Sequence, residues 1–103
     1  ACIHVMNISH DQFTSTISSP MCSHVNVGSG RDVTIAELAS IIARVVGFEG
    51  DIEFDESKAD GTPRKLMDVG RLHSLGWKHS IELEQGIYET YDWFLDNQEK
   101  LRT

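Results

Sequence analysis

Two adjacent cations and a nearby carboxylate stand out in the segment 60–65, which reads DGTPRK. Lys65 or Arg64 could neutralise phosphate oxygens, and Asp60 could accept hydrogen bonds from sugar hydroxyls or from a base amide edge. A flexible glycine and a rigid proline lie between them, and a ligand that joins a nucleotide diphosphate to a sugar needs this combination of groups. The same residues also suit a solvated turn with surface ion pairs, and residue chemistry alone favours that second interpretation.

The glycines of Gly28-Ser29-Gly30 follow an alternating apolar segment and precede a predicted helix, an order that can indicate a dinucleotide-binding loop. The full G-x-G-x-x-G pattern needs a third glycine at the position of Val33. The acidic residue that ends the next predicted strand, Asp55, comes 25 residues after Gly30 instead of about 20. We therefore interpret the glycines as a turn between a strand and a helix.

Cysteine and histidine spacing indicates neither a metal site nor a nucleophilic catalyst. Cys2 and Cys22 lack the C-x-x-C or Cys/His spacing of zinc sites, and reduced thiols are the simplest interpretation. The sequence contains no G-x-S-x-G, H-x-x-H or H-E-x-x-H segment. We therefore assign no catalytic residue and no metal ligand. The histidines are His4, His10, His24, His73 and His79.

The chain has 103 residues, a size typical of one domain, and a formal net charge of −7 at pH 7. A field of this sign repels polyanions and argues against nucleic acid or an anionic membrane as a partner. No apolar run approaches the roughly 20 residues that span a bilayer, and no signal peptide is evident at the N-terminus. We expect a cytoplasmic protein in which any anionic ligand must find a local basic pocket.

Hydrophobic periodicity over residues 24–55 predicts a strand, a turn, a helix and a second strand. Residues 24–27 alternate between β-branched and polar side chains, and residues 51–55 alternate again. Between them, the segment TIAE at 34–37 matches a capping box, and apolar residues recur every three to four positions until Gly47. Two strands joined through a helix most naturally lie parallel with a right-handed crossover.

A helix and two loops are predicted outside this unit. The apolar spacing of residues 2–13 predicts the tail of a helix, which leads into a surface loop rich in hydroxyl side chains at 14–20. Residues 56–67 contain a glycine and a proline and cannot form a regular helix interior or a central strand. This second segment must therefore be a shaped loop.

Two further helices are predicted after that loop. Asp68 is a plausible N-cap for a short helix that carries Leu72 and Leu75 and ends at Gly76. Apolar residues over about 82–101 then trace one face of a final amphipathic helix.

Four segments occur along the chain in a recognisable order: VNVGSG at 25–30, TIAELA at 34–39, DGTPRKLMD at 60–68 and LHSLGW at 72–77. Together they resemble the GDP-L-fucose synthase family of the extended short-chain dehydrogenase/reductase group. The opening IHVM and the closing YDWFLDNQ are similar as well, so the resemblance covers nearly the whole chain. The DGTPRK run is its more discriminating part.

The resemblance implies an NADP-dependent enzyme that epimerises GDP-4-keto-6-deoxymannose at two carbons and reduces its ketone to give GDP-L-fucose. In that family NADP lies on an N-terminal Rossmann domain, where a serine and a Tyr-x-x-x-Lys motif carry out the reduction. Neither Tyr88 nor Tyr91 has a lysine four residues later. We therefore expect a C-terminal fragment that lacks the dinucleotide-binding domain, holds no cofactor of its own and is not catalytic alone.

The family pattern also implies which residues bind substrate. Asp60 matches a position that contacts the GDP-sugar, Lys65 matches a basic residue near the nucleotide diphosphate, and Arg64 is a weaker neighbour. The expected fold of residues 1–103 is α/β: the substrate-binding lobe of an extended short-chain dehydrogenase/reductase, with a small parallel strand pair, three main helices and no Rossmann domain. The expected partner is a GDP-sugar, held together with the missing Rossmann domain.

The alternative is a free-standing binding or protein-interaction module derived from such an enzyme. A two-stranded sheet is marginal by itself, so such a module is expected to self-associate through the exposed face that would meet the other lobe. Light scattering distinguishes the two interpretations, because a monomer that binds no partner counts against the module.

Overall fold

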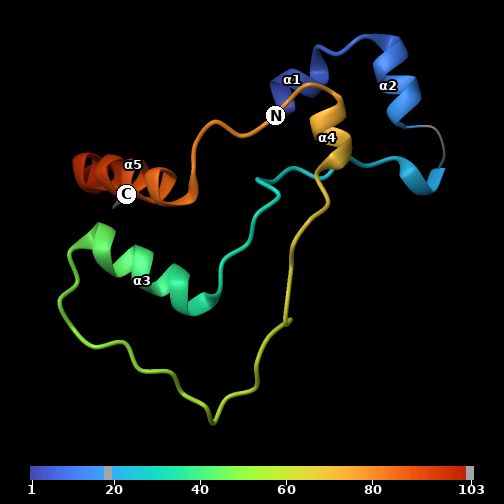
Figure 1. The fold of residues 1–103 in the computed structure, drawn as a ribbon. Helices are drawn as coiled ribbons and strands as arrows, with labels where there is room; N and C mark the ends of the chain where they lie inside the picture. Colours follow the sequence, from blue (N-terminus) through green and yellow to red (C-terminus); the bar gives the residue numbers. More distant parts are fainter. Residues whose placement is uncertain (18–19, 102–103) are drawn as a thin grey trace. The chain divides into compact units, whose positions relative to one another are not determined.

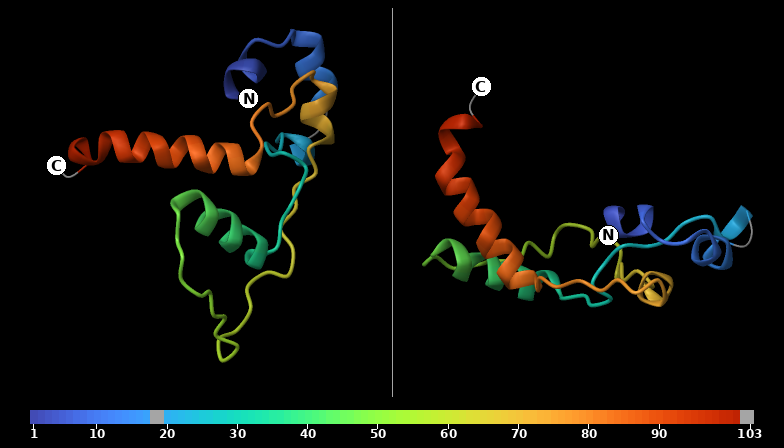
Figure 2. Two further views of the ribbon diagram at one scale, coloured as in Figure 1. Left: turned by 60° about the vertical axis from the view of Figure 1, so that its left-hand side comes forward. Right: turned by 90° about the horizontal axis from the view of Figure 1, so that it is seen from above.

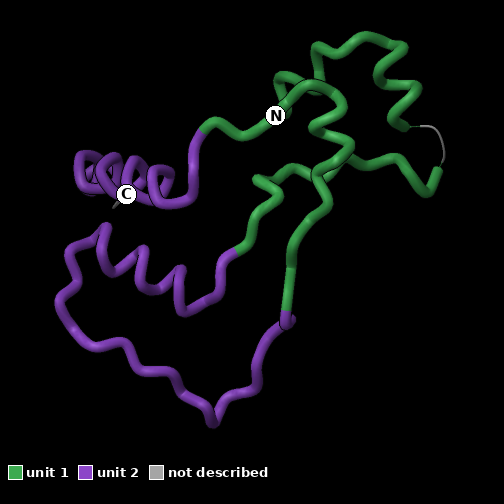
Figure 3. The backbone as a smooth tube through the Cα atoms, viewed as in Figure 1, with its two compact units in different colours: residues 1–32, 64–80 green, residues 33–63, 81–103 purple. Residues whose placement is uncertain are grey.

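The computed structural model describes residues 1–17 and 20–101, which form helices joined by irregular segments (Figure 1). The chain divides into two compact units (Figure 3). Unit 1 comprises Ala1–Asp32 and Arg64–Ser80, and unit 2 comprises Val33–Pro63 and Ile81–Thr103. The chain therefore passes between the units three times.

Unit 1 begins with two short helices, α1 (Cys2–Met6) and α2 (His10–Thr16), where the sequence predicts one continuous helix over residues 2–13. Ser9 is extended, its hydroxyl accepts from the Gln12 backbone N–H at 3.2 Å, and the Gln12 side chain accepts from the Ser9 N–H at 3.1 Å. This capping box starts a new helix. The prediction of a single helix is therefore wrong.

The predicted loop at 14–20 is helical at its start, because α2 continues through Thr16. Residues 18–19 of that predicted loop lie outside the described residues. A 3-10 turn, η1 (Pro20–Cys22), comes next. The backbone carbonyls of Cys22 and His24 accept hydrogen bonds from Arg71 Nη1, at 3.3 and 3.2 Å, which fixes the segment after η1 to the later part of unit 1.

The short helix α4 (Gly70–Ser74) carries the core of unit 1. Leu72 is fully buried, and Val69 and Leu75, which flank the helix, are nearly so. His4 of α1 reaches the same place, because its Nε2 lies 2.7 Å from the Leu75 carbonyl oxygen. A carbonyl can only accept, so His4 carries a proton on Nε2. The first and the last helix of unit 1 are thus joined.

Local hydrogen bonds define both ends of α4. At its start, the Asp68 carboxylate accepts from the Gly70 N–H at 2.8 Å, although the N-cap position falls on Val69, one residue later than predicted. At its end, Gly76 has a φ of 88°, in the left-handed region that glycine enters without strain. The next N–H, from Trp77, donates to the Leu72 carbonyl at 3.3 Å. The predicted end at Gly76 is confirmed.

Unit 2 contains the predicted helix α3 (Ile35–Val46). The capping box is confirmed: the Glu37 N–H donates to Thr34 Oγ1 at 3.1 Å, and the Thr34 N–H donates to Glu37 Oε2 at 2.7 Å. Gly47, with a φ of 70°, ends the helix. Local sequence signals therefore set both ends of α3.

The second long helix of unit 2, α5 (Leu83–Asn97), is followed by a 3-10 turn, η2 (Gln98–Lys100), close to the helix predicted over residues 82–101. α3 and α5 lie side by side (Figures 1 and 2). Arg44 Nε donates to Glu84 Oε1 at 2.8 Å, which joins the two helices by an ion pair. Trp93, on α5, stays exposed.

The predicted parallel strand pair is not present. Residues 24–27 belong to unit 1 and residues 51–55 to unit 2, and neither segment forms a strand within the described chain. A strand requires a ladder of hydrogen bonds to a neighbour. No such ladder forms here, so alternating side chains alone do not produce a sheet. The irregular loop predicted over residues 56–67 is confirmed.

Candidate functional site

The three side chains predicted to bind a ligand are all exposed. Arg64 and Lys65 open the second segment of unit 1, whereas Asp60 belongs to unit 2. The intervening glycine and proline account for the irregular backbone, because they disfavour both helix and central strand. Each of the three groups is accessible to a ligand in water.

Arg64 is held by a residue that sequence reasoning missed. Its Nε donates to Asp32 Oδ2 at 2.6 Å, and its Nη2 donates to Asp32 Oδ1 at 3.2 Å. The two residues are 32 positions apart, a separation for which no local spacing rule exists. The only signal in the sequence is that Asp32 closely follows the glycine turn.

The bidentate pair shifts the titration of both partners. The hydrogen bond from Arg64 holds the pKa of the Asp32 carboxyl below its usual value, and the same bond raises the pKa of the Arg64 guanidinium. Asp32 is therefore ionised at neutral pH and balances the charge of Arg64. The pair spends two of the five N–H groups of the guanidinium.

Lys65 and Asp60 have no ion pair or hydrogen bond to any other described residue. For Lys65, the residue after Arg64, this leaves an unneutralised ammonium on a chain whose net charge is −7. An exposed cation of this kind is available to an anionic ligand. Asp60 likewise keeps its acceptor capacity free for hydroxyl or amide donors.

The upstream end of the loop is fixed by Asp55 and Ser57. Asp55 Oδ1 accepts from the Ser57 N–H at 3.0 Å and from the Ser57 hydroxyl at 2.5 Å. These bonds lower the pKa of the Asp55 carboxyl. Such a turn is a local structural device, and it directs no group toward a ligand.

The glycine turn is explained by packing. A Cβ on Gly30 would lie 2.9 Å from Val69 Cγ2, and one on Gly28 would lie 3.5 Å from Met67 Cε. Gly30 also has a φ of 75°. The helix that follows does not begin until Ile35. The geometry therefore agrees with a turn packed on the core residue Val69, and the glycines do not open a helix as a dinucleotide-binding loop requires.

A small polar pocket of about 220 Å³ lies in unit 1, lined by His24, Asn26, Asp68 and Arg71. Its polar groups are largely used within the unit. Asn26 Nδ2 donates to the Asp68 carbonyl at 3.1 Å, and Arg71 donates to the two backbone carbonyls of the segment after η1. The pocket is explained by these structural contacts.

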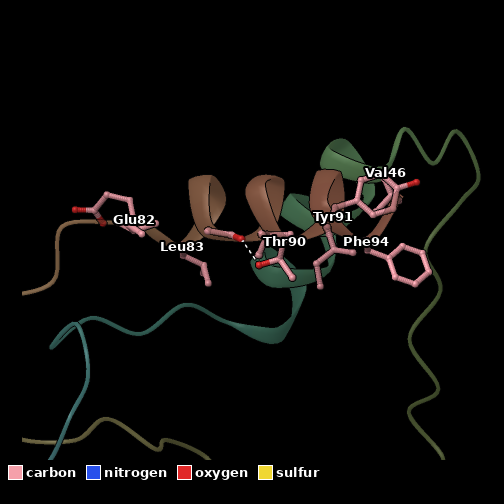
Figure 4. Close-up of a pocket in the computed structure, with 10 residues that line it drawn as sticks. Val46, Glu82, Leu83, Thr90, Tyr91 and Phe94 are labelled. Carbon is pink, nitrogen blue, oxygen red and sulfur yellow. Dashed lines mark hydrogen bonds between the residues drawn. The ribbon is translucent and has the colours of Figure 1, made fainter. Parts of the chain in front are cut away.

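An apolar groove of about 690 Å³ lies between α3 and α5 in unit 2 (Figure 4). Its walls are almost entirely hydrocarbon. The Thr90 hydroxyl donates to the Gly86 carbonyl at 2.7 Å. The lining contains no lysine or arginine to neutralise the phosphates of a nucleotide. Its lining residues are Ile42, Val46, Ile81, Glu82, Leu83, Gly86, Ile87, Thr90, Tyr91 and Phe94.

No cluster of three or more metal-ligating side chains occurs among residues 1–17 and 20–101. Within the same ranges, no helix has both the length and the apolar character needed to cross a bilayer. The two cysteines are free thiols.

Comparison with known proteins confirms the resemblance noted in the sequence. The chain is 57% identical to GDP-L-fucose synthase of Escherichia coli over 102 residues, which is 99% of this chain and 32% of that enzyme. The chain thus spans about a third of the length of this relative. No protein-family model matches the chain.

Solved structures of the same enzyme group have the same fold in this region. A GDP-6-OMe-4-keto-L-xylo-heptose reductase from Campylobacter jejuni matches 82% of the chain, at 40% identity and a TM-score of 0.73, over 25% of its own length. A GDP-mannoheptose C4 reductase from the same organism, solved with NADP bound, matches 91% at 36% identity and a TM-score of 0.70, over 27% of its length. The chain therefore has the fold of a region of extended short-chain dehydrogenase/reductase enzymes.

Proposed function

We propose that this chain is the nucleotide-sugar-binding region of an NADP-dependent GDP-sugar epimerase-reductase. In this proposal it holds the substrate, GDP-4-keto-6-deoxymannose or GDP-L-fucose, while a separate dinucleotide-binding domain holds NADP and performs the chemistry. The region by itself is not catalytic. The free thiols and the absence of a disulfide among the described cysteines favour the cytoplasm as its compartment.

The unneutralised ammonium of Lys65 is the observation that carries the proposal. The enzymes named above act on different sugars, but GDP is the part that their names share. A region common to all of them is best suited to the shared part. Lys65 offers a point charge to the diphosphate, and Arg64 beside it offers the N–H groups that Asp32 leaves unused.

We assign Asp60 a different contact from the two cations. An ionised carboxylate is an acceptor only, so it repels phosphate oxygens and suits donors such as sugar hydroxyls or the amide edge of guanine. Asp60 is exposed, and no described residue competes for its oxygens. Removal of the Asp60 carboxylate should therefore weaken binding through the loss of these hydrogen bonds, and the charge of the diphosphate plays no part in that loss.

A chimeric enzyme tests the proposal. In it, this chain replaces the matching third of the Escherichia coli GDP-L-fucose synthase, and NADPH consumption is measured with GDP-4-keto-6-deoxymannose. Lys65→Ala should raise KM about tenfold, because a charge-assisted hydrogen bond contributes on the order of 1.5 kcal/mol or more. Asp60→Ala should raise KM to a similar extent, and kcat should change less.

Matched variants of exposed residues serve as controls. Lys58→Ala removes a neighbouring lysine whose nearest carboxylate contact is 4.0 Å, and Asp51→Ala removes an exposed carboxylate. Both should leave KM within about twofold, the range expected for a surface charge away from ligand. Wild-type kcat/KM in both Lys65→Ala and Asp60→Ala, or an inactive chimera without substitutions, would contradict the proposal.

Self-association is the alternative function, and the apolar groove between α3 and α5 favours it. A groove of this size on a small protein suits a second copy of the chain. Light scattering over a range of concentrations tests this alternative: Phe94→Glu, in the groove, should dissociate a dimer, whereas Tyr88→Glu, outside it on the same helix, should not. A monomer at every concentration rules it out.

A further inference from the structure

We propose that Asp32 is a positioning residue for the nucleotide-diphosphate site, acting by orienting the guanidinium of Arg64. The inference rests on the proposed function and extends it to a residue that no comparison assigns. Without a partner, the long Arg64 side chain adopts many rotamers in water. The carboxylate of Asp32 restricts it to one orientation.

The geometry of the pair decides which N–H groups remain for a ligand. Asp32 takes the Nε edge of the guanidinium, through contacts of 2.6 and 3.2 Å. The other N–H of Nη2 and both of Nη1 have no partner among the described residues. Two of these donors, one on each Nη, lie along the end of the planar group, an edge that matches two oxygens of a phosphate.

Asp32 itself is supported by the core of unit 1. The turn that precedes it packs through Gly30 on Val69, which is nearly buried. Within that turn, the Ser29 hydroxyl accepts from the Arg31 N–H at 3.2 Å. The carboxylate therefore stands two residues beyond a turn that is fixed on the core. A contact that begins on a supported backbone orients its partner better than one between two free side chains.

Other contacts join the segment that carries Arg64 to the segment that carries Asp32. Asn26 donates to the Asp68 carbonyl, and the glycine turn lies against Met67 and Val69. Together with the Asp32–Arg64 pair, these contacts place residues 26–32 close to residues 64–69. The pair is therefore one of several contacts that hold the two segments together.

Orientation and simple electrostatics predict opposite results when Asp32 is changed. Removing a negative charge beside two cations strengthens the attraction for a diphosphate. Releasing Arg64 from its partner restores the side-chain freedom that binding must then remove, which weakens the interaction. The sign of the effect therefore separates a positioning role from a neutralising role.

The experiment measures GDP binding to the chimeric enzyme by calorimetry, with guanosine as the ligand without phosphate. Asp32→Asn should weaken GDP binding about threefold or more although it removes a negative charge near the diphosphate, and Asp32→Glu should recover part of the loss. Guanosine binding should not change, which a general structural defect would not spare. In an Arg64→Ala background, Asp32→Asn should have no further effect on GDP.

Asp55→Asn is the matched control. It replaces an exposed, hydrogen-bonded carboxylate in unit 2 and removes one negative charge, as Asp32→Asn does. It should leave GDP binding unchanged. Unchanged or tighter GDP binding by Asp32→Asn, in a protein where Lys65→Ala is impaired, would overturn the inference and leave the proposed function standing. If Lys65→Ala and Arg64→Ala both bind GDP normally, the proposed function itself fails.

Discussion

The two units reach their structures by different routes. Unit 1 has short helices, yet it buries Val69, Leu72 and Leu75 and connects distant segments by hydrogen bonds such as the one from His4 to Leu75. Unit 2 has the two longest helices, yet none of its described residues is buried. Helix length and core formation are therefore separate properties in this chain. Unit 1 buries its core residues, whereas the two long helices of unit 2 meet through exposed and half-buried side chains such as the Arg44–Glu84 pair.

The largest expected effect is a loss of stability when a buried side chain of unit 1 is shortened, compared with an exposed one of unit 2. Leu72→Ala should lower the free energy of unfolding by about 2–5 kcal/mol, because it leaves a cavity in a fully packed place. Ile42→Ala, at a position that is 41% exposed on α3, should cost about 1 kcal/mol or less. Urea unfolding followed by circular dichroism measures both. Equal losses would show that burial does not distinguish the units.

A smaller effect concerns the capping boxes, which both units contain. Thr34→Ala should cost about 1–2 kcal/mol, because the lost hydroxyl accepts from the Glu37 N–H at 3.1 Å and donates to the Glu37 carboxylate at 2.9 Å. Ser9→Ala should cost about 0.5–1 kcal/mol, because the lost hydroxyl donates to the neutral side-chain amide of Gln12 at 3.2 Å. Amide hydrogen exchange in the first turns of α3 and α2 measures each loss. The reverse order would contradict the argument from charge.

The smallest expected effect concerns the pKa values of two carboxyl groups and the pH dependence of stability that follows from them. Arg64 lowers the pKa of Asp32 in unit 1, and Ser57 lowers that of Asp55 in unit 2, from a usual value of 3.8. A depressed pKa in the folded state stabilises the fold above the unfolded-state value, and that contribution is lost as the pH falls from about 4 through the folded-state pKa. Acidification should therefore weaken both units below pH 4.

A separate substitution tests the cause of each pKa shift. In a carbon NMR titration of the carboxyl groups, Arg64→Ala should return the pKa of Asp32 toward its usual value and leave Asp55 unchanged. Ser57→Ala should do the reverse. A variant that moved both carboxyls would mean that the two shifts share a cause.

Local signals explain which parts of the fold the sequence predicts. α3 is predicted with its limits because Thr34, Glu37 and Gly47 act within one turn of the residues that they affect. The end of α4 at Gly76 is predicted for the same reason. The break before α2 is missed because the capping role of Ser9 competes with a helical apolar pattern that continues across it.

Features that need a remote partner are not predicted. The alternating segments 24–27 and 51–55 read as strands, but a strand exists only with a neighbour, and the two segments belong to different units. Asp32 is missed in the candidate site for a similar reason, since its partner is Arg64. The roles of Asp60, Lys65 and Arg64 in ligand binding stay predictions until the variants are measured.

The two tryptophans are divided between the units. Trp77 is half-buried just beyond α4 in unit 1, and Trp93 is exposed on α5 in unit 2. A Trp93→Phe variant therefore leaves a fluorophore that reports on unit 1, and Trp77→Phe leaves one that reports on unit 2. Tryptophan fluorescence of the two variants therefore follows the unfolding of each unit separately.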